Sequence, residues 1–347
     1  MVLRSTTCCI VLMMVKIKMY NQANLEKFKV FLEEEDNFLL LSHVLPDGDS
    51  VGSTLAMAEV LKSMGKNYKI LFRDPVPKIY RFLLASNNVY NLETIKNNIL
   101  PNFIVLDCSE FNRLGEEMNF LLGHAKKVVN IDHHISNDNF GDIQIVKNNA
   151  AATCEVLYQI FNSLNLKLNV NAVKALYTGI VTDTGGFRYE STSRETFLAA
   201  ADLIELGVDL GEIRENIYEN KEWPSILILQ KALNNLKASE DGLLAWLHVT
   251  AEEMADADAS GEHCEGIVNI PLSITGVKMG FFFREMPDGK IKVGLRARRG
   301  YDVNKVAAFF GGGGHAQAAG CTLDGPLNAA ILKVINAAEV TLRREAY

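Results

Sequence analysis

Several features that would point to other protein classes are missing from this chain of 347 residues. The six cysteines form no CxxC pair and no disulfide-like framework, which excludes the common zinc-binding patterns and indicates reduced thiols in a cytoplasmic protein. A basic excess is also missing. The net charge is −7, so the chain lacks the positive surface with which proteins grip long duplex nucleic acid. Long internal repeats and low-complexity tracts are absent as well.

Long hydrophobic runs are equally scarce. The apolar segment 8–15 imitates a short signal peptide, but Lys16 and Lys18 interrupt the pattern and no small-residue cleavage site follows. The segment is also far shorter than the roughly 20 residues that span a bilayer. We therefore expect no membrane association, and an irregular start with true initiation at Met14 or Met19.

The length of the chain favours two domains. Short apolar runs predict strands at 38–42, 68–72, 103–106, 128–131 and 143–146, and helical spacing predicts helices at 54–64, 153–164 and 170–180. Strands that alternate with helices predict an α/β fold with a parallel sheet covered on both faces. We assign this N-terminal domain to residues 20–201.

A helical linker is expected over residues 202–236, and a smaller C-terminal α/β domain with a mixed sheet over residues 237–347. In the latter, strands are predicted at 243–249, 277–284 and 290–296. The turn Pro287-Asp288-Gly289 between the last two is typical of a β-hairpin. A short helix at 304–310 then leads into four glycines at 311–314. We expect a substrate cleft between the two domains.

Four polar clusters stand where hydrophobic segments stop, as expected at the carboxyl ends of parallel strands. They are the loop from His43 to Asp49, the single Asp107, the triplet Asp132-His133-His134, and the run 182–186, which contains Asp183. Alone, such elements are often turns, surface histidines or helix caps. Together, carboxylates and imidazoles favour a site for two divalent ions that act on a phosphate ester.

Within this site the residue spacing suggests a division. His43, Asp47 and Asp49 share one loop, Asp107 is placed to bridge two ions, and His133 and Asp183 would complete the second ion's ligands. The helix after the loop is expected to start near Ser53, so that its N-terminus faces an anion.

These motifs closely resemble the DHH phosphoesterase superfamily, from about Phe38 to the C-terminus. The run Gly312-Gly313-Gly314-His315 with Ala318-Ala319-Gly320 looks like the DHH-associated C-terminal domain. The pairing is similar to the bacterial nanoRNase/pAp phosphatases of the NrnA type. That resemblance implies hydrolysis of short oligoribonucleotides to mononucleotides and of 3′-phosphoadenosine 5′-phosphate (pAp) to AMP and phosphate.

The resemblance also implies roles for individual residues. One metal would be held by His43, Asp47 and Asp107, and the other by Asp49, Asp107, His133 and Asp183. Asp132 would orient an imidazole, and His134 would face the substrate phosphate as a general acid or as a charge stabiliser. The ions are expected to be Mn²⁺, with Mg²⁺ or Co²⁺ as alternatives.

Substrate contacts are expected mainly from the second domain. Gly313 and Gly314 can expose backbone N–H groups to a phosphate, and the resemblance places Arg296 and His315 near the substrate. Arg113 is a further candidate for a phosphate contact. Strand alternation would point Arg298 to the same side as Arg296, unless the strand has already ended.

Three alternatives to this function remain open. A phosphodiesterase for cyclic or linear dinucleotides would share the fold and the metals, whereas an inorganic pyrophosphatase fits the glycine-rich motif poorly. A catalytically silent nucleotide-binding regulatory protein belongs to another class. The sequence does not choose among substrates, and it leaves the oligomeric state open between a monomer and a homodimer.

Overall fold

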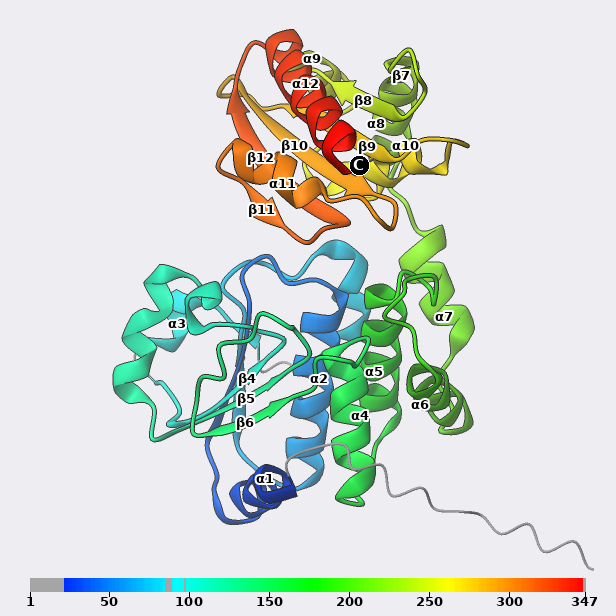
Figure 1. Ribbon diagram of the computed structural model, residues 1–347. Coiled ribbons are helices and arrows are strands. Elements are labelled where there is room, and N and C mark those ends of the chain that lie inside the picture. The colour runs from blue at the N-terminus through cyan, green and yellow to red at the C-terminus, as the bar shows by residue number, and fades with distance from the viewer. Residues whose placement is uncertain (1–21, 85–88, 97, 346–347) are drawn as a thin grey trace, which may run out of the picture. The chain divides into compact units, whose positions relative to one another are not determined.

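A computed structural model describes residues 22–84, 89–96 and 98–345 and divides into two units, Met1–Glu219 and Asn220–Tyr347 (Figure 1). The proposed start sites Met14 and Met19 lie outside the described residues. The boundary between the units falls inside the segment predicted as a helical linker.

A six-stranded parallel sheet forms the centre of the first unit, in the order β3-β2-β1-β4-β5-β6. Its strands are β1 (Phe38–Ser42), β2 (Tyr68–Leu71), β3 (Val89–Tyr90), β4 (Asn102–Leu106), β5 (Lys127–Asp132) and β6 (Ile143–Val146). The predicted parallel sheet is thus confirmed. The strand order reverses between β1 and β4, and crevices at such switch points are where open α/β sheets bind ligands.

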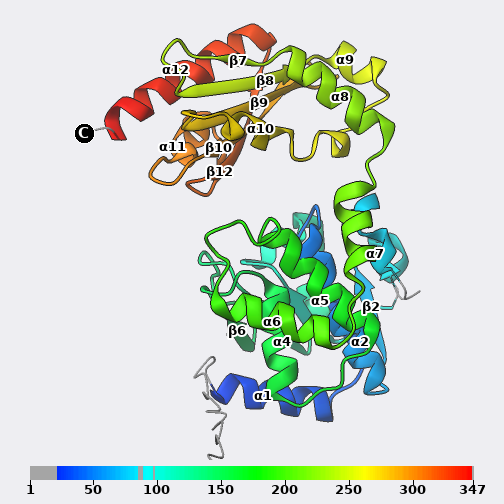
Figure 2. The same ribbon diagram turned by 90° about the vertical axis from the view of Figure 1, so that its right-hand side faces the viewer.

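Both faces of this sheet are covered, as predicted. Phe38 and Leu40 of β1 enter one core, and Leu39 and Leu41 enter the other, because side chains alternate along a strand. The first core is closed by α1 (Gln22–Glu34), which runs along the bottom of this unit in Figure 2, and by α2 (Gly48–Ser63), α4 (Thr153–Ser163), α5 (Val170–Asp183) and α6 (Arg194–Glu205). The second core is closed by α3 (Leu92–Ile95) and the 3₁₀ segments η2 (Phe111–Leu114) and η3 (Glu116–His124).

Two helix boundaries differ from the prediction, and both matter for the polar clusters. Helix α2 begins at Gly48 rather than near Ser53, because the Asp47 side chain caps it by accepting the Ser50 N–H at 3.0 Å. Helix α5 continues to Asp183, so this carboxylate lies at the end of a helix and not at the end of a strand. The C-terminus of α2 is as expected, with Gly65 in the left-handed region at φ +71°.

Between residues 202 and 236 the described elements are helical. They are the end of α6, then α7 (Leu210–Arg214), a π-helical turn (Glu215–Glu219) and α8 (Trp223–Asn234). Ile228 and Ala232 of α8 pack against Leu247 and Val249, so this helix belongs to the core of the second unit.

The second unit contains a mixed six-stranded sheet, as predicted, in the order β11-β12-β10-β9-β8-β7. Its strands are β7 (Lys237–Ala238), β8 (Leu244–Val249), β9 (Met279–Glu285), β10 (Lys290–Ala297), β11 (Gly313–Gly314) and β12 (Ala318–Asp324); only β8 and β9 pair in parallel. One core is closed by α11 (Val303–Phe309) and α12 (Leu327–Glu345), the other by α8, α9 (Ala251–Asp256) and α10 (Ile270–Ser273).

Gly313 and Gly314 lie in an edge strand rather than in an open loop, and because alternate N–H groups of such a strand face the partner, pairing engages only one of the two. Both residues form β11 and pair with β12, and the N–H of His315 donates to the Ala318 carbonyl at 2.7 Å. A Cβ at Gly314, where φ is +149°, would stand 2.4 Å from the Ala318 oxygen. Glycine is therefore required here by the tight hairpin itself.

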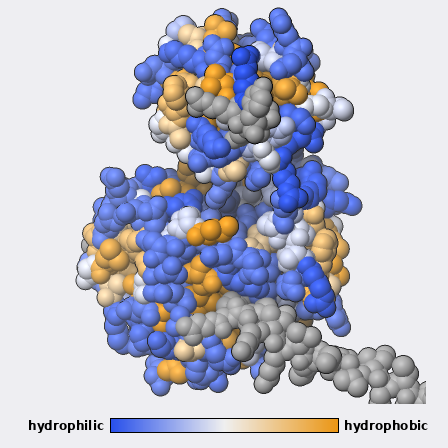
Figure 3. Space-filling model, in the orientation of Figure 1, coloured by the Kyte–Doolittle hydropathy of each residue, from blue (hydrophilic) through white to orange (hydrophobic). Residues whose placement is uncertain are grey.

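The surface in Figure 3 is mainly hydrophilic, and its hydrophobic residues form separate patches on each unit rather than one continuous band. Within the described residues, no helix combines the length and apolar character needed to cross a membrane.

Candidate metal centre

All six predicted metal ligands come together at the switch point of the first sheet. The loop after β1 supplies His43 and Asp47, β4 ends directly before Asp107, and β5 ends directly before His133. Helix α2 adds Asp49 from its first turn, and α5 adds Asp183 from its last. Ligand atoms of these residues fall into groups whose members lie within 4.8 Å of one another.

Asp107 belongs to one group with His43 and Asp47 and to another with His133 and His134, and His133 also forms a group with Asp49 and Asp183. His43 Nε2 lies 3.8 Å from Asp47 Oδ2 and 3.4 Å from Asp107 Oδ2. His133 Nε2 lies 3.9 Å from Asp49 Oδ2, 3.6 Å from Asp107 Oδ1 and 3.4 Å from Asp183 Oδ2. The two oxygens of Asp107 therefore face different groups, as expected of a carboxylate that bridges two ions.

Asp107 is held in an unusual conformation. Its backbone lies in the left-handed region at φ +54°, which few residues other than glycine adopt outside turns and functional sites. Its N–H donates to the Ile131 carbonyl at 3.0 Å, and its side chain is buried. The hydroxyl of Thr153 donates to Asp107 Oδ1 at 3.0 Å.

Backbone carbonyls determine which nitrogen of each histidine faces its group. His43 Nδ1 lies 2.7 Å from the Val44 oxygen, and His133 Nδ1 lies 3.3 Å from the Ala150 oxygen. A carbonyl only accepts, so the proton of the neutral ring stays on Nδ1 and the lone pair of Nε2 faces the carboxylates. Both imidazoles are thus oriented as metal ligands usually are.

The imidazole that Asp132 orients is that of His134. Its Nδ1 donates to Asp132 Oδ1 at 2.8 Å, and the Nδ2 group of Asn137 donates to the other oxygen at 2.6 Å. Burial raises the pKa of Asp132, but the hydrogen bond and the charge of His134, together with the hydrogen bond from Asn137, leave the pKa below its usual value. His134 Nδ1 also lies 3.7 Å from Asp107, but its proton is directed at Asp132, which leaves Nε2 for other contacts.

The sequence interpretation missed the environment of Asp49. This buried carboxylate accepts the Thr153 N–H at 2.6 Å and the Cys154 N–H at 2.9 Å, both in the first turn of α4. Helix N-termini favour such negative charge. Gly179 lets α5 approach closely, because a Cβ there would stand 2.2 Å from Cys154 Sγ and 2.9 Å from Asp49 Oδ1. Asn137 and Thr153 were also missed, since a lone asparagine or threonine carries no recognisable signal.

The carboxylates of the cluster lie close together in a buried site, so nearby positive charge would stabilise their ionised forms. Burial, together with the charges of Asp107 and Asp183, raises the pKa of Asp49 well above its usual range, and burial raises the pKa of Asp183 to about 7 despite His133. Burial alone would lower the pKa values of His43 and His133, but the neighbouring aspartates raise both to about 9. Divalent cations would supply this charge, and a set of carboxylate and imidazole ligands suits Mn²⁺, Co²⁺ or Mg²⁺.

The predicted substrate residues are divided between the two units. Arg113 lies half-buried in η2, and its carbonyl accepts the Val44 N–H at 2.8 Å, next to His43. Arg296 is half-buried in β10, whereas Gly313, Gly314 and His315 are exposed.

Arg298 follows the end of β10, so strand alternation no longer applies to it. Its guanidinium donates to the Val277 and Leu272 carbonyls, both at 2.7 Å, which is a structural role.

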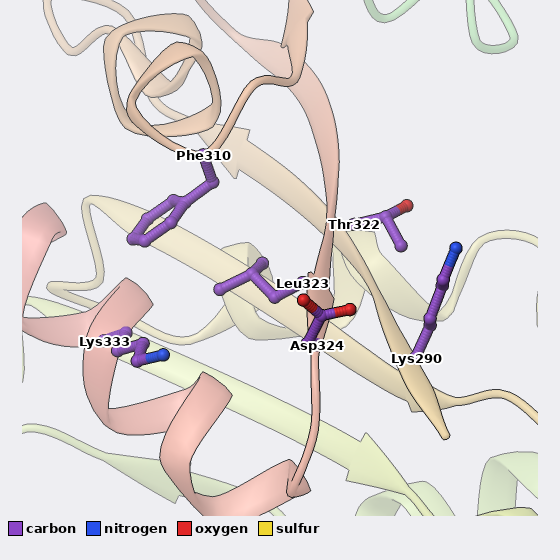
Figure 4. A pocket seen from close by; sticks show the side chains of 6 residues that line it. All are labelled: Lys290, Phe310, Thr322, Leu323, Asp324 and Lys333. Atoms are coloured by element: carbon purple, nitrogen blue, oxygen red, sulfur yellow. The ribbon is translucent and has the colours of Figure 1, made fainter. Parts of the chain in front are cut away.

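A cavity of about 430 Å³ in the second unit is separate from these residues (Figure 4). It is lined by Lys290, Phe310, Thr322, Leu323, Asp324 and Lys333. None of the predicted substrate residues is among them, and the cavity carries no recognisable catalytic chemistry.

Comparison with known proteins agrees with this geometry. The DHH family N-terminal domain matches residues 37–180, and the DHHA1 domain matches residues 245–340. The chain is 31% identical over 316 residues to the "Bifunctional oligoribonuclease and PAP phosphatase NrnA" of Thermus thermophilus, covering 90% of this chain and 92% of that protein. The protein of the same description from Bacillus subtilis is 27% identical, with coverages of 83% and 90%.

Solved structures show the same fold. An exopolyphosphatase-related protein from Bacteroides fragilis superimposes with a TM-score of 0.90 at 28% identity, covering 95% of this chain and 99% of that one. The exonuclease RecJ bound to manganese is more distant, with a TM-score of 0.54 at 16% identity and coverages of 91% and 94%. From the matched domains, the relatives and the ligand groups, it follows that the chain belongs to the DHH family and is a metal-dependent phosphoesterase with a C-terminal DHHA1 domain.

Proposed function

We propose that this phosphoesterase hydrolyses short oligoribonucleotides to mononucleotides and converts pAp to AMP and phosphate. The observation that carries the proposal is the pair of ligand groups that share Asp107. The NrnA proteins that it resembles over most of its length have both activities in their names, which supports these substrates.

We assign one divalent ion to His43, Asp47 and Asp107, and the other to Asp49, His133 and Asp183, with Asp107 joining this second set through its Oδ1, 3.6 Å from His133 Nε2. Mn²⁺ suits this ligand set, and Mg²⁺ and Co²⁺ are alternatives. Two such ions supply a nucleophile at neutral pH by lowering the pKa of water, and they offset charge on the phosphoryl oxygens.

The residues themselves orient the reactants. Asp132 holds His134 with the proton on Nδ1, so that Nε2 is available to the substrate phosphate. His134 acts on the substrate from Nε2, as a general acid toward the leaving oxygen or as a charge stabiliser. Asn137 fixes Asp132 in turn, which limits rotation of the pair.

Recognition of a chain end is assigned to Arg113, Arg296, Gly313, Gly314 and His315. Arginine suits a terminal phosphate because its planar fork can donate two parallel hydrogen bonds. No hydrogen bond of the Arg113 guanidinium is found among the described residues, which leaves this group available for an anion. The acidic net charge provides no track for a long strand or duplex, so short substrates are favoured.

A substrate panel tests the proposal. Turnover is measured with Mn²⁺ on a ribodinucleotide, a long RNA, pAp, cyclic di-AMP and pyrophosphate, and the Asp107→Asn variant is purified in parallel to reveal contaminating nucleases. We expect turnover of the ribodinucleotide and pAp, with little on long RNA. Preferential hydrolysis of cyclic di-AMP or pyrophosphate would instead identify another activity, and no turnover of any substrate would favour a silent nucleotide-binding protein.

A further inference from the structure

One short segment, residues 150–154, contacts three of the proposed ligands from three different elements. The Ala150 carbonyl lies 3.3 Å from His133 Nδ1, after β5. The Thr153 and Cys154 N–H groups hold Asp49, from α2. The Thr153 hydroxyl donates to Asp107, after β4. Thr153 therefore contacts both Asp49 and Asp107, which are 58 positions apart in the chain.

The Thr153 hydroxyl binds Oδ1 of Asp107, the carboxylate that the two ligand groups share. Asp107 Oδ1 faces His133, and Asp107 Oδ2 faces His43, so the rotation of this carboxylate decides whether both groups contain an oxygen ligand. The hydroxyl bonds Oδ1 at 3.0 Å and opposes that rotation. The residue is fully buried, so water cannot substitute for it readily.

The segment is itself rigidly held. Glu155, fully buried in the first turn of α4, accepts the Ala151 N–H at 3.1 Å and the Thr196 hydroxyl at 2.7 Å. The Nε2 group of Gln159 donates to the other oxygen of Glu155 at 3.0 Å. The segment around Thr153 is thus also held by contacts that do not involve the ligands.

We infer that Thr153 is a positioning residue of the metal centre, whose hydroxyl fixes the shared carboxylate of Asp107 so that both ions can be held at once. The inference rests on the two-ion centre of the proposed function. Groups that orient metal ligands typically contribute about 10–100-fold in metal affinity, and we expect a loss of that size when the hydroxyl is removed.

Two variant pairs isolate the hydroxyl. Thr153→Val keeps the volume and branching of the side chain, and comparison with the wild type reports the loss of the oxygen. Thr153→Ser and Thr153→Ala differ from each other chiefly by that oxygen, and they carry the test if the valine variant does not fold. Thr178→Val is the matched control, because Thr178 is also fully buried in a helix but donates only to the Lys174 carbonyl.

Binding of Mn²⁺ to chelator-treated protein is measured by calorimetry, with thermal unfolding recorded in the presence of chelator. The wild type and Thr178→Val should bind two ions with equal affinity. Thr153→Val and Thr153→Ala should lose about 10–100-fold in affinity for at least one ion, and Thr153→Ser should retain wild-type affinity. This order of Mn²⁺ affinities should hold even if the variants differ in unfolding temperature. If the role of Thr153 were purely structural, affinity would instead fall only in the variants that lose stability.

Wild-type affinity in Thr153→Val or Thr153→Ala would overturn the inference, as would a serine variant that is as impaired as the alanine variant. An equal loss in Thr178→Val would also overturn it, because any buried hydroxyl would then suffice. A wild type that binds no Mn²⁺ would overturn the inference and the proposed two-ion centre together. Two bound ions without turnover of the substrate panel would refute the proposed substrates and leave the role of Thr153 standing.

Discussion

Replacing Asp107 by asparagine should abolish activity while leaving the fold intact. Asparagine has nearly the same shape, and it tolerates the left-handed backbone at φ +54°. Alanine at this position would add about 1–2 kcal/mol of backbone strain and confuse loss of function with loss of stability. Asp107→Asn is therefore the cleaner test of the shared carboxylate.

The expected magnitude follows from the contacts of the carboxylate. Its oxygens lie 3.4 Å from His43 Nε2 and 3.6 Å from His133 Nε2, so one substitution removes a charged ligand from both groups. The amide that replaces it is neutral, and its nitrogen offers no lone pair to a cation. We expect kcat to fall at least about 10³-fold, which corresponds to about 4 kcal/mol of barrier.

The assay is release of phosphate from pAp at saturating Mn²⁺, with circular dichroism and thermal unfolding to check the fold. Asp258→Asn is a matched control, because Asp258 also has a left-handed backbone, at φ +49°, but is exposed and is not a member of any ligand group. Near-normal turnover by Asp107→Asn with two Mn²⁺ ions bound would refute the sharing role.

Three further predictions concern the metal, the substrate end and pH. Activity should disappear with a chelator and return with Mn²⁺ or Co²⁺ better than with Ca²⁺; turnover that survives exhaustive chelation would end the two-metal mechanism. Arg296→Ala should raise KM for substrates with a terminal phosphate, with a loss of about 1.5–3 kcal/mol in binding free energy. The loss should be smaller for an activated diester without that group. Equal losses on both substrates would show that Arg296 does not select the chain end. The raised pKa values of His43 and His133, about 9, and of Asp183, about 7, mean that protons compete with metal below those values. Affinity of the metal-free protein for Mn²⁺ should therefore rise from pH 7 to 9 in calorimetric titrations, and a flat profile would contradict this reasoning.

The strands of the first sheet were predictable because buried parallel strands are short, continuous apolar runs. Those at 38–42 and 143–146 match to the residue, and the other three differ by one residue at an end or at both. The two-residue strand β3 and the four-residue segment η2 were not predicted, since elements so short carry no periodic signal. The nine-residue 3₁₀ segment η3 was not predicted either.

The ligand types were equally visible in the sequence, because carboxylates and imidazoles at strand ends are unusual in combination. What the pattern misjudged was the element that carries Asp183 and the start of α2. Asp183 is the last residue of α5, a helix predicted to end at residue 180, and α2 starts early because the Asp47 side chain caps it.

By itself the sequence determined the kinds of ligand, the strand ends at which most of them lie, and the shape of the backbone at glycines such as Gly65. Only the tertiary structure decided which oxygen of Asp107 faces which histidine, that α4 holds Asp49 with its first amides, and that Thr153 joins the two carboxylates. The physical reason is separation along the chain. Thr153 is 46 residues from Asp107 and 104 from Asp49, and such contacts depend on how closely helices pack rather than on any local pattern.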